Sequence, residues 1–333
     1  MQDSNSWDLS VERGTGWCHF LQSAEWAEAM QTTAWKSNLT DLKTDSKTYP
    51  LALYERPAAG VGKIYLSSKL ATLAADQVKE FTSGLKNLAS GVAIKIDIDQ
   101  PYDEKTHKAL EKQGWKRSPS IQYQETVLVD LRKSTDELLQ SFKKRARWEI
   151  NAGLRRGIKV EKVPVTPENI NLVYRMLTET YKRANFFTRS QHFTETYWRA
   201  FDKSGQGSMY VASLDGKPLS SAFVIHIGKR AYYKDGASVR IKPDVFASRV
   251  MQWQIMQDLK EKGIETYDLC GISSNPKSSL AGVTLFKTGF AEPIQLQWGY
   301  ELPLSGWQYK LWKSFLERSV LKYSSAVRKE LWY

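Results

Sequence analysis

The segment ETVLVDLRKSTDELLQSFKKRARWEINAGLRRGIKV, residues 125–160, joins an alternating apolar run to a basic run with helical periodicity. Glu125–Leu131 alternates apolar and polar side chains, and this period of two predicts a strand with one buried face. Ser134 stands three residues before Glu137, a capping-box pattern that predicts the first turn of a helix. A strand that leads directly into a helix is typical of chains that combine sheets and helices in layers.

The residues after Glu137 predict a single amphipathic helix that ends at Gly157. Its apolar positions recur every four residues: Leu138, Phe142, Ala146, Ile150 and Leu154. Side chains at this spacing share one face of a helix, so we expect them to form a buried stripe. A glycine directly after the periodic run is a common helix end.

A basic stripe lies beside the apolar one on this predicted helix. Seven Lys or Arg residues occur between positions 143 and 159, opposed only by Glu149. Lys143 and Arg147 border the edge that faces the core, from which an arginine can donate paired hydrogen bonds to a phosphate or carboxylate. We predict that these two side chains contact an anionic substrate. The other cations of the run are predicted to be solvated: Lys144, Arg145, Arg156 and Lys159.

Outside this segment, helix and strand patterns follow one another in two similar series. The expected helices are 24–30, 75–88, 103–113, 168–184, 246–262 and 307–331, with a further helix-forming patch at 280–288. The expected strands are 49–54, 62–66, 91–98, 209–216, 218–228, 229–238 and 266–271. A hairpin turn at residues 215–217 joins strands 209–216 and 218–228. The pattern predicts an α/β (α+β) chain of two units, whose mixed, mostly antiparallel sheets are flanked by helices.

Composition limits the classes of function. Hydrophobic residues make up 41% and charged residues 25% of the 333, which is typical of a globular chain. The net charge of +12 favours anionic partners, such as nucleic acid, a nucleotide-linked substrate or an anionic membrane surface. Two distant cysteines, Cys18 and Cys270, exclude a disulfide scaffold. No apolar run approaches the ~20 residues that span a bilayer, and the first residues carry no signal pattern, so we expect a cytoplasmic chain without stable membrane insertion.

Five stretches in sequence order resemble the FemABX family of peptidoglycan aminoacyltransferases. The segment 126–161 resembles the family's strand and basic helix, and FLQSAEWAEAM (20–30) its N-terminal helix. LDGKPLSSAFVIHIGKRAYYKDGAS (214–238) resembles its central hairpin. RVMQWQIMQDLKEKGIETYDLCGI (249–272) and LFKTGFAEP (285–293) resemble its last helix and the turn beyond it. Together these stretches extend over nearly the whole chain.

The resemblance implies two acetyltransferase-like (GNAT-related) domains, namely 1–132 with a C-terminal helix at 305–333, and 133–304. It implies the compact form of the family, because no long heptad segment for a coiled-coil arm is present. The implied reaction moves an amino acid (Ala, Ser or Gly) from aminoacyl-tRNA to the stem-peptide amine of a peptidoglycan precursor, either UDP-MurNAc-pentapeptide or lipid II. We expect a monomer that needs no cofactor.

The resemblance also implies site residues. Lys287, with Phe286 beside it, matches a family lysine that we expect to bind phosphate or to stabilise the tetrahedral intermediate. Asp97 and Asp99 share a strand face, and one of them is expected to bind the nucleophilic amine or to accept its proton. The implied substrate-binding residues are Phe286, Arg189, Phe193, Tyr197, Tyr233, Lys36 and Trp35, together with Arg147 and Lys143 from the basic stripe.

This chain departs from the family pattern at several of these positions. Phe193 stands where some members have Tyr, which removes a hydroxyl, and Tyr197 lies one turn further on. Asp235 replaces the second tyrosine of the family's strand. Ser67, Ser68 and Lys69 replace an "RGP"-like stretch.

Two other functions are compatible with the sequence. A GNAT-like domain could instead transfer an acyl group from acyl-CoA, whose pyrophosphate binds a glycine-rich loop that opens a helix. The nearest such string, RPAAGVGK (56–63), leads into a strand, which counts against this alternative. A basic, non-catalytic RNA-binding protein is the other, but no RNA-recognition motif is present. The four histidines have no neighbours at metal-ligand spacing, so no metal site is predicted.

Overall fold

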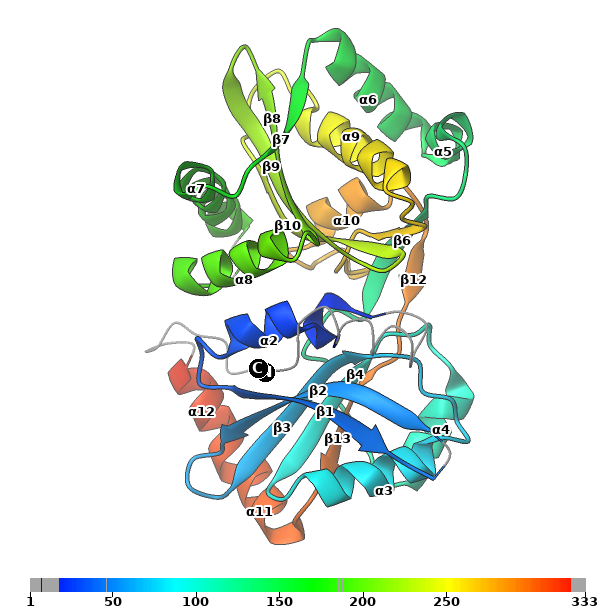
Figure 1. Ribbon diagram of the computed structural model, residues 1–333, viewed down its shortest axis with the longest axis vertical. Helices are drawn as coiled ribbons and strands as arrows, with labels where there is room; N and C mark the ends of the chain where they lie inside the picture. The colour runs from blue at the N-terminus through cyan, green and yellow to red at the C-terminus, as the bar shows by residue number, and fades with distance from the viewer. Residues whose placement is uncertain (1–6, 8–17, 46, 185, 187–188, 325–333) are drawn as a thin grey trace. The chain divides into compact units, whose positions relative to one another are not determined.

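The computed structural model describes residues 7, 18–45, 47–184, 186 and 189–324 (Figure 1). Contacts divide the chain into two compact units: unit one is Met1–Gln124 with Gln295–Tyr333, and unit two is Glu125–Ile294. Each unit is built on one sheet with helices packed against it. The predicted fold class, two mixed and mostly antiparallel sheets flanked by helices, is confirmed.

The sheet of unit one has six strands in the order β1-β2-β3-β4-β13-β5. The neighbours are antiparallel except β3 and β4, which run parallel. The strands are β1 Lys36–Lys43, β2 Thr48–Pro57, β3 Lys63–Leu70, β4 Ala93–Ile98, β5 Lys116–Ser118 and β13 Gly299–Pro303. The string RPAAGVGK forms the turn between β2 and β3 and opens no helix, as the sequence predicts.

Helices and the alternation of β4 give this sheet two different faces. The helical elements of unit one are η1 Phe20–Gln22, α2 Ala24–Met30, α3 Val78–Leu88, α4 Glu104–Lys112, α11 Gly306–Leu311, the π-helical turn η2 Trp312–Leu316 and α12 Glu317–Tyr323. Ile94, Ile96 and Ile98 pack into one core with Phe81 and Leu85 of α3. Because side chains alternate along a strand, Lys95, Asp97 and Asp99 point to the opposite face.

The sheet of unit two has seven strands in the order β12-β6-β11-β10-β9-β8-β7. Strands β10 and β11 are parallel. The pairs β6–β11, β9–β10, β8–β9 and β7–β8 are antiparallel. The strands are β6 Glu125–Asp130, β7 Lys159–Val163, β8 Gly207–Leu214, β9 Lys217–Ile227, β10 Arg230–Ser238, β11 Thr266–Asp268 and β12 Pro293–Gln295.

Helices cover both faces of the second sheet (Figure 1). Helix α9 Ala247–Glu261 packs on one face and against α6 Lys144–Arg155, whereas α7 Pro167–Ala184 and α8 Gln191–Lys203 pack on the other. The short α10 Ala281–Lys287 follows β11. The main core lies between the sheet and the α6–α9 layer, where α9 buries side chains around most of its circumference.

The single helix predicted between Ser134 and Gly157 is wrong, because the chain forms two helices, α5 Thr135–Ser141 and α6. Phe142 is extended at the joint, and its ring packs edge-on against Trp253 and Phe290. The N–H of Lys143 then donates to Gly289 O at 2.9 Å. Long-range contacts thus pull two residues out of the helix. The predicted apolar stripe is buried except at Leu154, which is 48% exposed because the last turn of α6 directs Gly153, and not Leu154, toward Val250 of α9.

Other boundaries differ from the sequence-based prediction where short elements join distant partners. Strand β6 belongs to the second sheet because it pairs with β11, so residues 125–132 lie in unit two and not in the first domain. Strand β13 pairs with β4 and β5, which places residues 295–304 in unit one. No sequence pattern predicted β1, β5, β7, β12, β13 or α8. The predicted last helix is interrupted by η2, and its residues 325–331 lie outside the described part of the chain.

In the described part of the chain, no helix is both long and apolar enough to cross a bilayer.

Candidate active site

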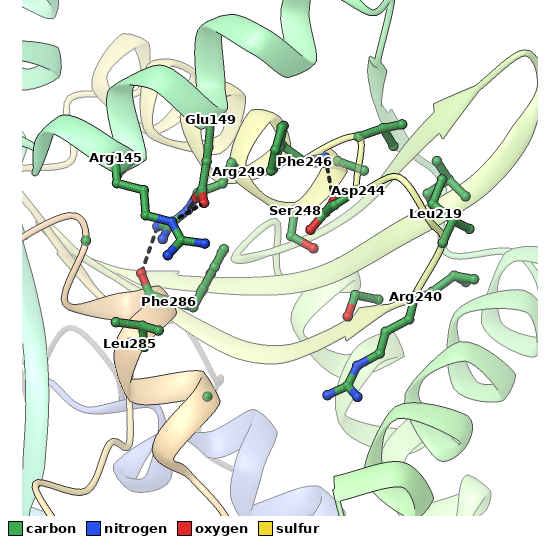
Figure 2. A pocket seen from close by; sticks show the side chains of 18 of the residues that line it. Arg145, Glu149, Leu219, Arg240, Asp244, Phe246, Ser248, Arg249, Leu285 and Phe286 are labelled. Carbon is green, nitrogen blue, oxygen red and sulfur yellow. Dashed lines mark hydrogen bonds and ion pairs between the residues drawn. The ribbon is translucent and has the colours of Figure 1, made fainter. Parts of the chain in front are cut away.

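A pocket of about 590 Å³ opens in unit two beside α6, α9 and α10 (Figure 2). Its walls come from the first turns of α6 and α9, the loop 239–246 between β10 and α9, and the segment 282–289. Figure 2 shows Arg145, Glu149 and Arg249 at one end of the pocket and Arg240 at the other. The pocket therefore brings together four segments that are far apart in sequence.

The pocket has the features of an anion site. Helices α6 and α9 both begin at its wall, and neither N-terminus receives a hydrogen bond from a capping side chain. The first amides of a helix lack intrahelical acceptors and carry a partial positive charge, so they favour phosphate or carboxylate. Arg145, Arg240 and Lys242 line the same pocket with exposed cationic side chains. The pocket thus suits a ligand that carries several negative charges.

A chain of charged groups fixes one wall of the pocket. Arg249 Nε donates to Glu149 Oε2 at 2.7 Å, and Arg249 Nη1 donates to Phe286 O at 2.7 Å. Arg145 Nε donates to Glu149 Oε1 at 2.8 Å, while the Arg145 side chain remains 77% exposed. Arg249 and Glu149 are each 8% exposed, so this ion pair is buried and links α6, α9 and α10.

Two residues of the sequence LFKTGF, Phe286 and Gly289, pack closely against this wall. A Cβ at Gly289 would lie 2.8 Å from Arg249 Nη1 and 3.1 Å from Phe286 O, so only glycine leaves room for the guanidinium. Phe286 lies in the pocket wall, with its ring 4.3 Å from the Arg249 guanidinium carbon. The motif therefore positions both an aromatic side chain and a buried arginine.

Lys287 points away from the side of α10 that carries Phe286. Its Nζ donates to Gly271 O at 2.9 Å and lies 5.8 Å from the centre of the Tyr233 ring. Burial lowers the pKa of Lys287, and the nearby Cys270 and Asp268 act weakly in the opposite direction. Lys287 does not line the pocket described above, whereas Phe286 does, so the two side chains lie in different environments.

Tyr233 is held next to Lys287 by a β-bulge. The register between β10 and β9 shifts between Tyr233 and Asp235. A Cβ at Gly236 would lie 1.9 Å from the Tyr233 hydroxyl oxygen, so glycine is required beneath the ring. Burial raises the pKa of Tyr233, which keeps its hydroxyl protonated and able to donate a hydrogen bond. Lys287 and Tyr233 are thus neighbours in unit two.

Arg189, Phe193 and Tyr197 form a second cluster in unit two. The Arg189 guanidinium carbon lies 4.7 Å from the Phe193 ring centre, and the Phe193 and Tyr197 ring centres are 5.7 Å apart. The Tyr197 hydroxyl donates to Asp235 Oδ2 at 2.5 Å, and Trp198 Nε1 donates to the same oxygen at 2.9 Å. Tyr197 therefore does not supply the hydroxyl that Phe193 lacks, because its own is engaged by Asp235.

The structure corrects the expectation for the basic stripe. Arg147 Nη1 donates to Gln140 O at 2.9 Å and to Phe142 O at 2.5 Å, so it caps the end of α5 and does not line the pocket. Arg145 is 77% exposed, as predicted for a solvated residue, and it also lines the pocket. Lys143 also lines it, and its Nζ lies 3.2 Å from Glu292 Oε1. The break at Phe142 rotates α6 relative to the predicted helix and so changes which cations face the pocket.

Trp35 and Lys36 do not form a pair in unit one. Trp35 is buried at 4% exposure, and the Arg56 guanidinium carbon lies 5.9 Å from its ring centre. Lys36 is exposed at the start of β1, opposite Glu55 of β2. Consecutive residues of a strand point to opposite faces, so the tryptophan and the lysine are separated.

Asp97 and Asp99 are both buried in unit one, at 3% exposure each. Lys69 Nζ lies 3.7 Å from Asp99 Oδ1, donates to Tyr123 O at 2.9 Å and sits 4.0 Å from the Tyr123 ring centre. The N–H of Ile121 donates to Asp97 Oδ1 at 3.3 Å. Burial raises the pKa of Asp97 to about 6, although Lys69 and the Ile121 amide act to lower it. The cation that these carboxylates meet here is Lys69.

Asp97→Asn should stabilise the protein at neutral pH. The folded-state pKa of Asp97 lies above the usual 3.8, so the ionised carboxylate costs stability above pH 6, and this cost disappears below pH 4. The expected gain at pH 7.5 is about 2–3 kcal/mol, from about two pKa units at 1.36 kcal/mol each. Urea denaturation at pH 4 and pH 7.5 measures it, with the exposed Asp41→Asn on the same sheet as control. A gain that is equal at both pH values contradicts this assignment.

Long-range pairs in the structure include residues whose partners no local pattern predicted. Arg249 carried no signal. Asp235 and Lys69 stood out only as departures from the family pattern, and Glu149 only as the single acid in the basic run. Another long-range pair joins Arg230 Nη2 to Asp268 Oδ2 at 2.5 Å, and its carboxylate is fully buried. Within the described residues, no group of three His, Cys, Asp or Glu side chains could hold a metal ion.

Residues 140–278 match the family model described as an acetyltransferase (GNAT) domain. The chain is similar to the lipid II:glycine glycyltransferases of Staphylococcus haemolyticus and Staphylococcus aureus. It is 23% identical to each, over 338 and 344 residues respectively, and in both cases the match covers 77% of this chain and 80% of the relative.

Solved structures show the same fold. The crystal structure of FemX superposes with a TM-score of 0.82 at 20% identity, over 93% of this chain and 98% of that one. The C-terminal domain of a putative lysylphosphatidylglycerol synthetase from Agrobacterium fabrum superposes with a TM-score of 0.55 at 15% identity, over 96% and 98% of the two chains. The chain therefore has the fold of FemX.

Proposed function

Because the chain is a homologue of the FemABX aminoacyltransferases and contains a GNAT-type acyltransferase domain, we propose that it extends peptidoglycan cross-bridges. In this proposal it transfers one amino acid from an aminoacyl-tRNA to the stem-peptide amine of a peptidoglycan precursor. The relatives named lipid II:glycine glycyltransferase favour glycine as the transferred residue and a lipid-linked acceptor. The reaction would take place at the cytoplasmic side, where both substrates are made.

The observation that carries the proposal is the anion pocket of unit two. Uncapped helix starts and three exposed cations suit the phosphates at the 3′ end of a tRNA. Trp148 is 55% exposed, and its ring lies 5.3 Å from that of Phe246 at the pocket edge. Unpaired bases stack on exposed aromatic rings of this kind. Arg156 approaches the same Phe246 ring at 5.1 Å, which adds to the positive field.

The chemical step is aminolysis of the aminoacyl ester. The acceptor nitrogen attacks the ester carbonyl carbon, the C–N bond forms, and the bond from that carbon to the ribose oxygen breaks. One proton leaves the nitrogen, and one is delivered to the ribose oxygen. Lys287 has the properties to stabilise the oxyanion and to deliver that proton, because burial lowers the pKa of its ammonium. The Tyr233 ring lies beside this lysine, with its centre 5.8 Å from Nζ.

On the acceptor side, Arg189 would bind the diphosphate of the precursor. Its guanidinium is partly buried over the Phe193 ring, which orients it, and a planar guanidinium can donate paired hydrogen bonds to an anion. Asp97 and Asp99 stay proposals as amine-binding groups, but a substrate amine would have to compete with Lys69 for them.

Mass spectrometry tests the proposal directly. The protein is incubated with mixed aminoacyl-tRNAs and either UDP-MurNAc-pentapeptide or lipid II, and the precursor is examined for one added residue. Addition with glycyl-tRNA and lipid II is the expected result. No addition to either acceptor contradicts the proposal. Transfer from acyl-CoA in place of aminoacyl-tRNA, or tRNA binding without any product, would favour the two alternative functions.

Arg145→Gln with Arg240→Gln should weaken use of the donor. Both side chains line the pocket and are exposed, so their loss should leave the fold intact. We expect the KM for aminoacyl-tRNA to rise at least tenfold with little change in kcat. The slope of log KM against log salt concentration should fall by about 1.4, because each of the two lost phosphate contacts contributes ~0.7. Steady-state kinetics across a KCl series measures both. Lys159→Gln with Lys217→Gln removes the same charge from exposed positions of unit two, and an equal effect there contradicts a local role for the pocket.

A further inference from the structure

The outer face of the helical segment 306–324 in unit one exposes large apolar side chains. Trp307 is 67% exposed, Leu311 37% and Phe315 71%. These residues are spaced four apart, so they form one stripe across α11 and η2. Leu321 and Tyr323 extend the exposed apolar surface along α12, at 37% and 53%. We call this exposed side of the segment the outer face.

The inner face of the same segment holds it to the sheet without help from the outer face. Trp312 and Tyr309 are buried at 1% and 9% exposure. Tyr309 also donates a hydrogen bond to Glu301 of β13. Lys313 and Lys95 each lie within 3.4 Å of both Glu301 and Glu317.

The π-helical turn η2 contributes residues to both the buried inner face and the exposed outer face. It inserts an extra residue into the helical turn Trp312–Leu316. Within this turn Trp312 is fully buried, whereas Phe315 is the most exposed large apolar side chain of the segment. The stripe is therefore surplus to the packing of unit one.

The charges of the outer face have one sign. Lys310, Arg318 and Lys322 are exposed there. Glu317 is the one acidic residue among positions 306–324, and it is engaged on the inner side, with its carboxylate 2.6 Å from Lys313 Nζ and 3.4 Å from Lys95 Nζ. Among positions 306–324, the exposed charges beside the apolar stripe are therefore all positive. Such a surface complements a partner that has an apolar interior and an anionic surface layer.

We propose that the outer face binds the surface of a bilayer that contains anionic lipid. A helix with Trp, Phe and Leu on one side and Lys or Arg beside them lies in the interface, with the aromatic rings at the headgroup level and the cations at lipid phosphates. Such binding needs no membrane-spanning helix. The inference does not depend on the identity of the acyl donor or acceptor, because it concerns a surface of unit one that the proposed reaction does not use.

Vesicle flotation of the full chain tests the proposal. Phosphatidylcholine vesicles with and without phosphatidylglycerol serve as the probes. We expect binding to vesicles that contain phosphatidylglycerol, and weaker binding without it or at high salt. Trp307→Ser with Phe315→Ser should reduce the partition coefficient at least tenfold, because two aromatic rings no longer enter the interface. Leu88→Ser, 43% exposed on α3 of the same unit, is the matched control and should bind as the parent does.

The charges provide a second, milder set of variants. Lys310→Gln and Lys322→Gln each replace one exposed ammonium group by a neutral amide. Each should weaken binding to the vesicles about fivefold at low salt. Circular dichroism and thermal melting establish that every variant is folded.

Three outcomes overturn the proposal. They are no flotation of the parent chain with either vesicle type, equal flotation of the Trp307→Ser, Phe315→Ser variant, and loss of binding in the Leu88→Ser control. Concentration-dependent dimerisation of the parent that disappears in the same double variant would assign the outer face to a second copy of the chain instead.

Discussion

Lys287→Met should abolish transfer while leaving the protein as stable as the parent, or more so. Methionine keeps the aliphatic stem of Lys287 but removes the ammonium, which folding buries at a cost that is visible in its lowered pKa. Loss of one preorganised charge next to a developing oxyanion typically costs 10²–10³ in kcat. We expect a loss of this size with the KM values of both substrates unchanged within about twofold.

The control for this prediction separates chemistry from folding. Lys277→Met changes an exposed lysine in the loop before the same helix and should leave kcat and the melting temperature unchanged. A purely structural Lys287, held only by its bond to Gly271 O, would show reduced stability with proportionate loss of activity. Unchanged activity in Lys287→Met would remove Lys287 from the mechanism altogether.

Glu149→Ala should destabilise unit two by about 3–5 kcal/mol. The substitution leaves the Arg249 guanidinium buried with no carboxylate, and an uncompensated buried charge is costly. It also removes the group that ties α6 to α9 at the pocket wall. Urea denaturation at neutral pH, followed by tryptophan fluorescence, measures the change in the free energy of unfolding.

A surface pair with the same spacing provides the comparison. Glu195 and Arg199 form an exposed pair at 2.7 Å on α8, four residues apart like Arg145 and Glu149. Glu195→Ala should cost less than about 1 kcal/mol. Adding Arg249→Met to Glu149→Ala should recover at least half of the lost stability, because the buried charge is then absent. A double variant that is less stable than either single one would contradict this explanation.

Much of the site could be anticipated because its residues stand in short, strongly patterned motifs. LFKTGF gives Phe286, Lys287 and Gly289 in one stretch, and YYKDGAS gives Tyr233 three residues before Gly236. The glycines mark places where another group comes close, which the Arg249 guanidinium and the Tyr233 ring confirm. The chemical roles of these residues stay predictions until the variants are measured.

The sequence misassigned residues wherever a distant partner decides the conformation. Arg147 was preferred over Arg145 because an unbroken helix would place it at the cleft edge. The hydrogen bond from Lys143 N to Gly289 O and the packing of Phe142 on Phe290 break that helix, and both partners lie more than 140 residues away. No local pattern contains this information.

By itself, the sequence determined most of the longer helices and strands, the burial of four of the five stripe residues and the two-unit architecture. It could do so because periodicity records which face of an element meets the core, and this depends on neighbours only a few residues away. Tertiary structure decided which strands are neighbours, which cations reach the pocket, and which charges are paired in the interior. These outcomes depend on contacts such as that between Glu149 and Arg249, which are a hundred residues apart. Such a contact stabilises the fold only after α6 and α9 have packed together.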